Sequence, residues 1–325
     1  LLSRRQRQMC IRDRVSRPLQ AYYDILDKQF VQYFNDNGNL PLTVNGHLMP
    51  GKFELPGDVS SQFVSGLLFA LPLLKGDSEI IITSPLESAS YVDMTLNCLA
   101  KYGVKIENVD GAHRHYLVPG KQRFKAQDSK VEGDWSQAAF WTVGGALGAG
   151  ITASGVDFAS LQGDKAVVEI MQRMGADIVQ NADSVTVNSS TTKATVIDAS
   201  NCPDIIPVLT VLAAVSEGTT KIINAGRLRI KECDRLAAMT SELNKMGAAI
   251  KEEPEGLTIT GKPEGLRGGV EADAWNDHRI AMSLAIAAQC CAEPITLTGA
   301  GSVSKSYPDF WQDYQSVGGK IEVLA

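Results

Sequence analysis

Apolar residues gather along the chain in long helical runs that alternate with short strand-like runs. The first long run, Phe63–Leu74, predicts a buried helix, and Glu79–Ile82 after it predicts a strand. The same order returns in three later pairs: Ala138–Leu147 with Ile151–Ala153, Ile205–Val215 with Thr219–Ile223, and Ile280–Cys291 with Ile295–Thr298. Val185–Val187 and Leu257–Thr260 predict additional strands. This alternation predicts an α/β fold.

A short motif centred on glycine recurs through the chain and indicates an internal repeat. Its four copies are Lys101–Ile106, Arg173–Ile178, Lys245–Ile250 and Ser316–Ile321. The glycines lie 72, 72 and 71 residues apart, at Gly103, Gly175, Gly247 and Gly318. Each ends a helical pattern, where glycine adopts the left-handed conformation of a helix C-terminus at little cost. We therefore expect a few large helix–strand–helix–strand units arranged around a shared centre.

The segments outside the clear units have their own interpretations. Arg17–Leu48 resembles the tail of another unit, with Ile25–Phe34 as its closing helix. Residues 1–14 contain five arginines and little apolar patterning, and we interpret them as a non-native segment rather than a targeting peptide. The polar stretch Lys121–Lys130 predicts a domain boundary. We expect a partial first domain over residues 15–129 and a second domain of three units over residues 130–325.

Composition narrows the functional classes. The 325 residues are 44% hydrophobic and carry a net charge of −6, which argues against non-specific nucleic-acid binding. No apolar run reaches the length of a membrane span. The six cysteines form no CxxC pair, so we expect reduced thiols and a cytoplasmic protein. His113 and His115 lack an accompanying cysteine or carboxylate pattern, so no metal site is predicted.

Polar and charged residues gather where the predicted helices begin. The first helices of the units begin at Gly57–Gln62, Gly133–Gln137, Cys202–Asp204 and Asn276–Arg279. The second helices begin near Ser88–Tyr91, Gln162–Lys165, Lys231–Arg235 and Ser304–Pro308. Helix N-termini expose N–H groups and favour anions. If these ends converge, they form one anion-binding cleft.

Several of these residues also have an ordinary structural interpretation. Lys231 and Arg235 are four residues apart, which predicts a shared face in a first helical turn. That turn is either a solvated ion-paired surface or, because cations there oppose the helix dipole, an anion site. Lys305 precedes Pro308, which suits the first position of a helix. Ser60–Gln62 equally suits a simple N-cap.

Four motifs in order resemble the enolpyruvyl transferase family, and within it the EPSP synthases. They are Val59–Phe63, Arg229–Leu236, Asn276–Arg279 and Lys305–Asp309, and the resemblance extends from about Arg17 to the C-terminus. It implies a two-domain α/β fold of repeated βαβαββ units around a pseudo-threefold axis, with the first domain incomplete. It also implies transfer of the enolpyruvyl group of phosphoenolpyruvate to the 5-hydroxyl of shikimate 3-phosphate, in the shikimate pathway to chorismate and the aromatic amino acids.

The resemblance carries roles to particular residues. The implied substrate-binding residues are Ser60, Ser61, Gln62, Ser88, Tyr91, Asp204, Lys231, Arg235, Arg279 and Lys305. Arg235, Arg279 and Lys305 would bind phosphoenolpyruvate, and the residues from Ser60 to Tyr91 would bind shikimate 3-phosphate. Catalytic roles fall on Asp204, as acceptor of the hydroxyl proton, on Glu232, as the acid and base at the methylene carbon, and on Lys231. The resemblance implies a cytoplasmic monomer without metal or cofactor.

The chain departs from the family pattern at its start. The family motif Leu-Pro-Gly-Ser-Lys-Ser, with its catalytic lysine, and the Gly-Asn-x-Gly-Thr stretch are absent. We therefore expect an N-terminally truncated chain that shows no turnover, whereas a full-length parent is active. Two other functions stay open at this point: a sister enzyme that uses UDP-N-acetylglucosamine as acceptor, and a non-enzymatic anion-binding module.

Overall fold

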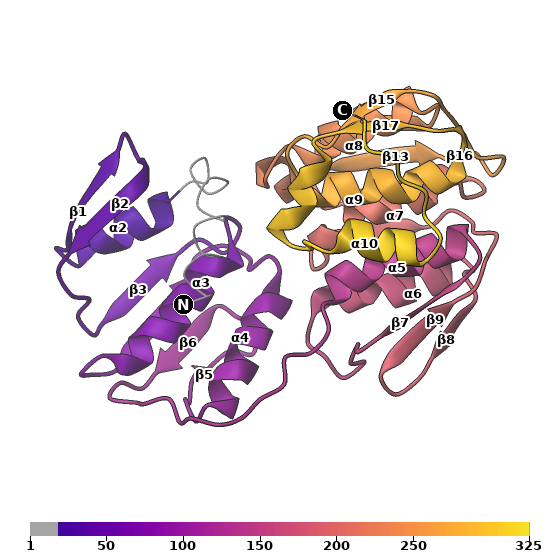
Figure 1. Cartoon of the computed structure of the whole chain (residues 1–325). Helices are drawn as coiled ribbons and strands as arrows, with labels where there is room; N and C mark the ends of the chain where they lie inside the picture. The colour runs from indigo at the N-terminus through magenta and orange to yellow at the C-terminus, as the bar shows by residue number, and fades with distance from the viewer. Residues whose placement is uncertain (1–18, 325) are drawn as a thin grey trace. The chain divides into compact units, whose positions relative to one another are not determined.

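The computed structural model describes residues 19–324, and these form two compact units (Figure 1). Unit 1 contains the described residues up to Val131 together with Leu161–Gly163, and unit 2 contains Glu132–Ser160 and the residues from Asp164 onward. The segment 1–14, expected to be non-native, lies outside the described residues. The predicted domains, 15–129 and 130–325, remain a prediction. The division into two compact units does not show that each unit is a domain with its own substrate.

One complete βαβαββ repeat makes up most of unit 1. Its elements are β3 (Lys52–Leu55), α3 (Ser61–Ala70, extended by the 3-10 turn Leu71–Leu73), β4 (Ser78–Ile82), α4 (Ala89–Lys101), β5 (Glu107–Asn108) and β6 (His115–Val118). The sheet order is β3-β4-β6-β5, with β3 and β4 parallel. Apolar residues of α3 and α4 pack against one face of this sheet, where Phe53, Ile80 and Tyr116 are buried.

The beginning of unit 1 differs from the prediction. The helix predicted over Ile25–Phe34 is wrong: the helix is α2 (Gln20–Lys28), and the hairpin of β1 (Gln32–Asp36) and β2 (Asn39–Asn45) follows it. Phe30, at φ 55°, is left-handed and stops the helix. Exposure alternates residue by residue along β1, which is the period of a strand rather than a helix.

Unit 2 begins with two further repeats. The first contains α5 (Trp135–Leu147), β7 (Ile151–Ser154), α6 (Ala166–Arg173, preceded by the 3-10 turn Gly163–Lys165), β8 (Ile178–Gln180) and β9 (Ser184–Val187). The second contains β10 (Val196–Asp198), the 3-10 turn η4 (Pro203–Ile205), α7 (Ile206–Ala214), β11 (Thr219–Ile223), the 3-10 segment η5 (Gly226–Ile230), α8 (Arg235–Lys245), β12 (Ala249–Glu253) and β13 (Gly256–Thr260). The order β10-β11-β13-β12 repeats that of unit 1, which confirms the predicted repeat.

The last repeat has a divided sheet. It contains β14 (Leu266–Gly268), β15 (Glu271–Asp273), α9 (His278–Ala287), the 3-10 turn η6 (Ala288–Cys290), β16 (Cys291–Glu293), β17 (Thr296–Thr298), the 3-10 segment η7 (Ala300–Lys305) and α10 (Phe310–Ser316). β14 pairs with β16 and β15 with β17, both in parallel. The predicted helix Ile280–Cys291 extends too far, because Cys291 begins β16.

Three helices form the centre of unit 2. Every residue of α7 and α9 is buried, and most of α5 is buried too. A helix that is apolar on all sides is stable only when other elements pack against every side of it. These three helices contact one another. Figure 1 shows α5, α7 and α9 as neighbours within this unit. Their N-terminal ends, one from each repeat, can therefore contribute to one site.

The repeat glycines have the predicted role. Gly103, Gly175, Gly247 and Gly318 end helices with φ of +81°, +92°, +102° and +100°. Side chains disfavour this left-handed region, which explains the regular recurrence of glycine. None of the described helices is long and apolar enough to cross a membrane.

Candidate active site

The predicted site residues of unit 2 follow strand ends that lie at the same edge of a sheet. β10 and β11 are parallel, with Asp198 beside Ile223 at their carboxyl ends. The loop after β10 leads to Asp204, and the loop after β11 leads to Lys231 and Glu232. Loops at the carboxyl ends of parallel strands are the usual place for ligand sites in α/β folds. One repeat thus brings its acidic and basic candidates to one edge.

The third repeat uses the same arrangement. β15 and β17 are parallel and end together at Asp273 and Thr298. Asp277 follows the first strand and caps α9, accepting a hydrogen bond from the backbone N of Arg279 at 2.8 Å. Lys305 follows the second strand, and its Nζ donates to the backbone O of Asn276. The two cations predicted to bind phosphoenolpyruvate in this repeat are therefore brought near each other, Arg279 in the first turn of α9 and Lys305 at the end of η7.

Arg235 is the centre of the charged cluster. Its side chain is 1% exposed and bonds three carboxylates. Nε donates to Asp277 at 2.8 Å, Nη1 to Asp204 at 2.8 Å, and Nη2 to Glu232 at 2.7 Å. Burial opposes the charge of Arg235, but these carboxylates outweigh it and raise its pKa. The guanidinium fork joins the second and third repeats through bonds in fixed directions.

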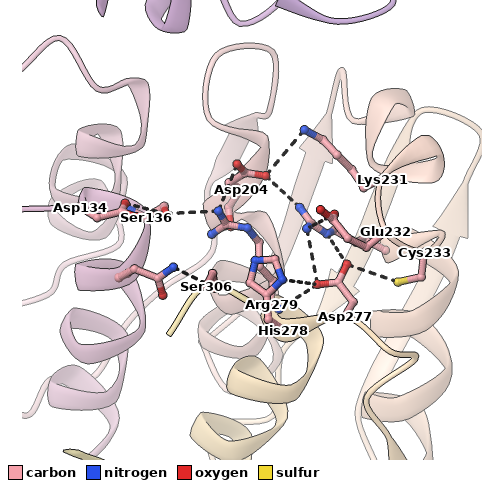
Figure 2. A network of polar contacts seen from close by, with 12 residues as sticks. Asp134, Ser136, Asp204, Lys231, Glu232, Cys233, Asp277, His278, Arg279 and Ser306 are labelled. Carbon is pink, nitrogen blue, oxygen red and sulfur yellow. Dashed lines mark hydrogen bonds and ion pairs between the residues drawn. The ribbon is translucent and has the colours of Figure 1, made fainter. Parts of the chain in front are cut away.

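Asp204 receives cations from two repeats. Its Oδ1 lies 2.8 Å from Arg235 and 3.7 Å from Nζ of Lys231, and its Oδ2 lies 3.2 Å from Nη2 of Arg279 (Figure 2). Burial alone would raise the pKa of this carboxyl. Arg279, Lys231 and Arg235 outweigh burial and hold the pKa well below its usual range. Asp204 is therefore ionised at neutral pH, with 17% of its side chain exposed.

Lys231 does not lie in a helix, so the predicted shared face with Arg235 is wrong. η5 ends at Ile230, and α8 begins at Arg235 after its N-cap Asp234, whose side chain accepts from the backbone N of Ala237. The cap therefore places the first residue of the helix four positions beyond Lys231. Burial lowers the pKa of Lys231, and the nearby Asp204 opposes that change.

His278 is buried behind Asp277 and Arg279. Burial, followed by the charge of Arg279, lowers its pKa to about 4, so its imidazole is neutral at physiological pH. Cys233 donates through Sγ to Asp277 at 3.6 Å, and burial raises the pKa of the thiol. Neither side chain supplies positive charge to the cluster.

Lys305 has a different local setting from the predicted one. It ends η7, and α10 begins only at Phe310, so Pro308 is not the first residue of that helix. Pro308 instead lies in the turn between the two elements. The next residue, Ser306, accepts a hydrogen bond from Nε2 of Gln137 on α5 at 3.3 Å.

The candidates of unit 1 also gather at one end of a repeat. Ser60 caps α3, and its side chain accepts from the backbone N of Gln62 at 3.3 Å, which confirms the N-cap. Ser88 precedes α4 with a left-handed φ of 53°, and its carbonyl accepts from the backbone N of Tyr91 at 3.1 Å. Two hydrogen bonds join these helix starts: the backbone N of Gly57 donates to Ser84, and its carbonyl accepts from Glu87.

Gly57 allows this close approach. A Cβ there would lie 2.7 Å from Cγ2 of Ile82 and 2.7 Å from the carbonyl O of Pro85. No side chain fits at those distances. Ser61 is buried in the first turn of α3, and Ser60 and Gln62 flank it with partly exposed or exposed side chains.

A family model described as EPSP synthase (3-phosphoshikimate 1-carboxyvinyltransferase) matches residues 14–314. The chain belongs to the EPSP synthase family. A protein from Clostridium kluyveri named 3-phosphoshikimate 1-carboxyvinyltransferase is 54% identical over 308 residues, which are 95% of this chain and 71% of that protein. One of the same name from Clostridium novyi is 52% identical over 95% of this chain and 70% of its own length.

Solved structures agree with the EPSP synthase assignment. An EPSP synthase from Acinetobacter baumannii matches with a TM-score of 0.80 and 27% identity, over 96% of this chain and 73% of that one. The enolpyruvyl transferase NikO from Streptomyces tendae shares the fold, with a TM-score of 0.77 at 20% identity, over 94% and 72% of the two chains. The predicted fold class is confirmed.

Two residues of this EPSP synthase family site were not predicted. Asp277 lies within the motif Asn276–Arg279, and the sequence alone assigns it no role, although it is 0% exposed and bonds both Arg235 and the start of α9. Its position before a buried helix is the N-cap signal that could have identified it. Ser136 bonds Arg279 across 143 positions of sequence, and no local pattern indicates that contact.

The cluster is electrically balanced. The carboxylates of Asp204, Glu232 and Asp277 face the cations of Arg235, Arg279 and Lys231. An incoming dianion would compete with Asp204 and Glu232 for these cations. Binding of such an anion therefore weakens the ion pairs that keep the pKa of Asp204 low.

Proposed function

We propose that the protein transfers the enolpyruvyl group of phosphoenolpyruvate to the 5-hydroxyl of shikimate 3-phosphate and releases phosphate. Its relatives at 54% and 52% identity bear the name of this activity. The observation that carries the proposal within the molecule is the contact of Arg279 and Arg235 with the single carboxylate of Asp204. Cations to hold an anionic substrate and a base to accept a proton thus occupy one place.

Arg235, Arg279 and Lys305 are the cations proposed to stabilise bound phosphoenolpyruvate, directly or through the charge around it. The substrate carries a carboxylate and a phosphate, and guanidinium groups bind both through paired N–H donors. Arg279 is the more available of the two arginines, with 10% of its side chain exposed against 1% for Arg235. We infer that Arg279 and Lys305 contact the substrate directly, while Arg235 adjusts the charge around it.

Two proton transfers complete the reaction. In the addition step the 5-hydroxyl oxygen forms a bond to C2 of phosphoenolpyruvate and its proton goes to Asp204. Glu232, which takes up a proton from water as the anionic substrates bind beside it, delivers that proton to the methylene carbon C3. In the elimination step Glu232 removes a proton from C3 as the bond from C2 to the phosphate oxygen breaks. Each general acid–base role contributes about 10²–10⁴-fold to the rate. Glu232, bonded to Arg235 at 2.7 Å, is held beside the cations that would bind the reacting substrate.

Asp204 becomes a better base when the anion binds. Before binding, three cations hold its pKa well below the usual range, which makes it a weak proton acceptor. An anion that draws Arg279 and Lys231 toward itself removes part of that stabilisation. The proton affinity of Asp204 then rises at the moment when the hydroxyl must be deprotonated.

Shikimate 3-phosphate binding falls to the helix starts of unit 1. Ser60 and Ser61 supply hydroxyls at the N-terminus of α3, where unpaired N–H groups favour a phosphate. Gln62, Ser88 and Tyr91 add an amide and two further hydroxyls. Lys231 is proposed to assist at the same substrate. The proposed setting is a cytoplasmic monomer, which sedimentation and cell fractionation would test.

The deciding experiment measures phosphate release with phosphoenolpyruvate and shikimate 3-phosphate. It is performed on the 325-residue chain and on the complete open reading frame of its gene. Release that requires both substrates and equals the enolpyruvyl product formed supports the proposal. Phosphate release with UDP-N-acetylglucosamine in place of shikimate 3-phosphate would reassign the acceptor. If no phosphate is released with either acceptor, the remaining candidate function is anion binding without catalysis.

A further inference from the structure

The first turn of α5 contacts Arg279 and the residue that follows Lys305, and the proposed function assigns Arg279 and Lys305 to phosphoenolpyruvate. This turn belongs to the first repeat of unit 2, while Arg279 and Lys305 belong to the third. Two neighbouring residues make the contacts: Ser136 reaches Arg279, and Gln137 reaches Ser306, the residue after Lys305. Figure 2 shows Ser136 directed toward Arg279.

The Ser136 hydroxyl has a fixed orientation. It donates its proton to Oδ1 of Asp134 at 2.7 Å, and Asp134 also accepts the backbone N of Ser136 at 2.8 Å as the N-cap of α5. A hydroxyl has one proton and two lone pairs. With the proton used, its oxygen is an acceptor for Nη2 of Arg279, at 3.2 Å. Ser136 is 4% exposed, so water does not substitute easily for this contact.

The Arg279 guanidinium therefore lies between two residues that contact it, Ser136 and Asp204. Nη2 contacts Ser136 on one side and Oδ2 of Asp204 on the other, both at 3.2 Å, and Nη1 donates to the backbone O of Asp204 at 3.3 Å. When a substrate anion competes for Arg279, the contact to Asp204 weakens because that partner is also an anion. The neutral Ser136 contact does not compete in this way, so it can hold the guanidinium in place.

Gln137 acts on the neighbouring segment. Its Nε2 donates to Oγ of Ser306 at 3.3 Å, while its Oε1 is buried and has no hydrogen-bond partner among residues 19–324. The bond from Nε2 to Ser306 orients the Gln137 amide, although Oε1 gains no partner in that orientation within the described residues. That bond ties the end of η7, where Lys305 lies, to α5.

We propose that Ser136 and Gln137 are positioning residues that hold Arg279 and the Lys305 segment in place to bind phosphoenolpyruvate. The inference rests on the proposed function and assigns neither residue to the chemical steps. A purely structural role, as helix-capping and packing residues, is the alternative. The two differ in what a substitution changes: the affinity for one substrate, or only the stability of the fold.

The test compares Ser136→Ala, Ser136→Thr and Gln137→Met with the wild-type complete open reading frame. Ser136→Ala is expected to raise the KM for phosphoenolpyruvate about tenfold, because a hydrogen bond to a charged group is lost, and to leave kcat and the KM for shikimate 3-phosphate nearly unchanged. Ser136→Thr keeps the hydroxyl and is expected to restore most of that KM. Gln137→Met is expected to raise the same KM about threefold.

A matched control is Ser283→Ala on α9. Ser283 is 0% exposed, and its hydroxyl has no hydrogen-bond partner in the described part of the chain. This variant removes the same atoms from an equally buried place without touching Arg279, so its KM for phosphoenolpyruvate should stay at the wild-type value. A lower melting temperature in all three alanine and methionine variants with no change of any KM would overturn the inference.

Turnover by the wild type separates this result from a failure of the proposed function. If the wild type turns over and the KM values do not respond, only the positioning inference falls. If the wild type does not turn over, calorimetric titration of phosphoenolpyruvate into the same variants decides the matter. The expected result is then about tenfold weaker binding to Ser136→Ala, and equal binding to all variants, or none to the wild type, would reject the inference.

Discussion

Replacing Asp204 by asparagine separates its two proposed roles. Asparagine keeps the shape and can still accept hydrogen bonds, but it carries no charge and is not a proton acceptor near neutral pH. The native carboxylate lies 2.8 Å from Arg235, 3.2 Å from Arg279 and 3.7 Å from Lys231. Asp204→Asn therefore removes both the base and the anion that competes with substrate.

These two losses have opposite signs in the kinetics. Loss of the general base is expected to lower kcat by about 10²–10⁴-fold. Loss of the competing charge leaves Arg279 more available to phosphoenolpyruvate. The KM for phosphoenolpyruvate should therefore stay the same or fall. The variant also loses charged hydrogen bonds, each of which contributes about 1.5–3 kcal/mol to the stability of the folded protein.

The assay is the initial rate of phosphate release as each substrate is varied, with Asp198→Asn as the control. Asp198 ends β10 in the same repeat, and its carboxylate bonds Ser200 and Asn224 rather than the cluster. A surface change of this kind should alter kcat by less than about twofold. A kcat within tenfold of wild type for Asp204→Asn, or a raised KM for phosphoenolpyruvate with unchanged kcat, would refute the reasoning.

Three further variants test other parts of the structure. Arg235→Met is expected to lower the free energy of unfolding by about 3–5 kcal/mol, because it leaves three carboxylates without their buried partner; unchanged urea denaturation would contradict this. The pKa of His278 is about 4 in the folded protein and about 6.5 in the unfolded chain. As pH falls through that interval the unfolded chain takes up the proton first, so the free energy of unfolding decreases by up to ~3 kcal/mol. His278→Gln should remove this part of the acid destabilisation seen in thermal melts between pH 7 and pH 4, and an unaltered pH profile would count against it. Gly57→Ala should cost about 1–3 kcal/mol from overpacking, whereas Gly301→Ala, with open space around it, should cost little; equal melting temperatures would show that the turn can relax.

Local sequence signals predicted most of the fold. The glycines at Gly103, Gly175 and Gly247 have the expected left-handed φ, because that requirement is set by a few neighbouring residues. The apolar helices and their following strands were likewise placed by periodicity. Errors arose at element ends: Cys291 begins a strand because it pairs with Leu266, a partner 25 positions earlier that no local pattern specifies.

The charged cluster was only partly predictable. Helix starts and resemblance identify Arg235, Arg279 and Asp204, but not the bonds among them, since those bonds join residues 31 and 75 positions apart in two repeats. Lys231 was placed in a helix because cations four residues apart suggest one. The N-cap Asp234 was the stronger signal, and reading it would have moved the helix start to Arg235.

The proposed function requires that phosphoenolpyruvate binds the cations of the third repeat in unit 2. The most direct measurement is the KM for each substrate in the double variant Arg279→Gln with Lys305→Gln, made in the complete open reading frame. Because two charged contacts are lost, the KM for phosphoenolpyruvate is predicted to rise at least about 100-fold while that for shikimate 3-phosphate changes little. A rise confined to the KM for shikimate 3-phosphate, or no change in either value, would contradict the account.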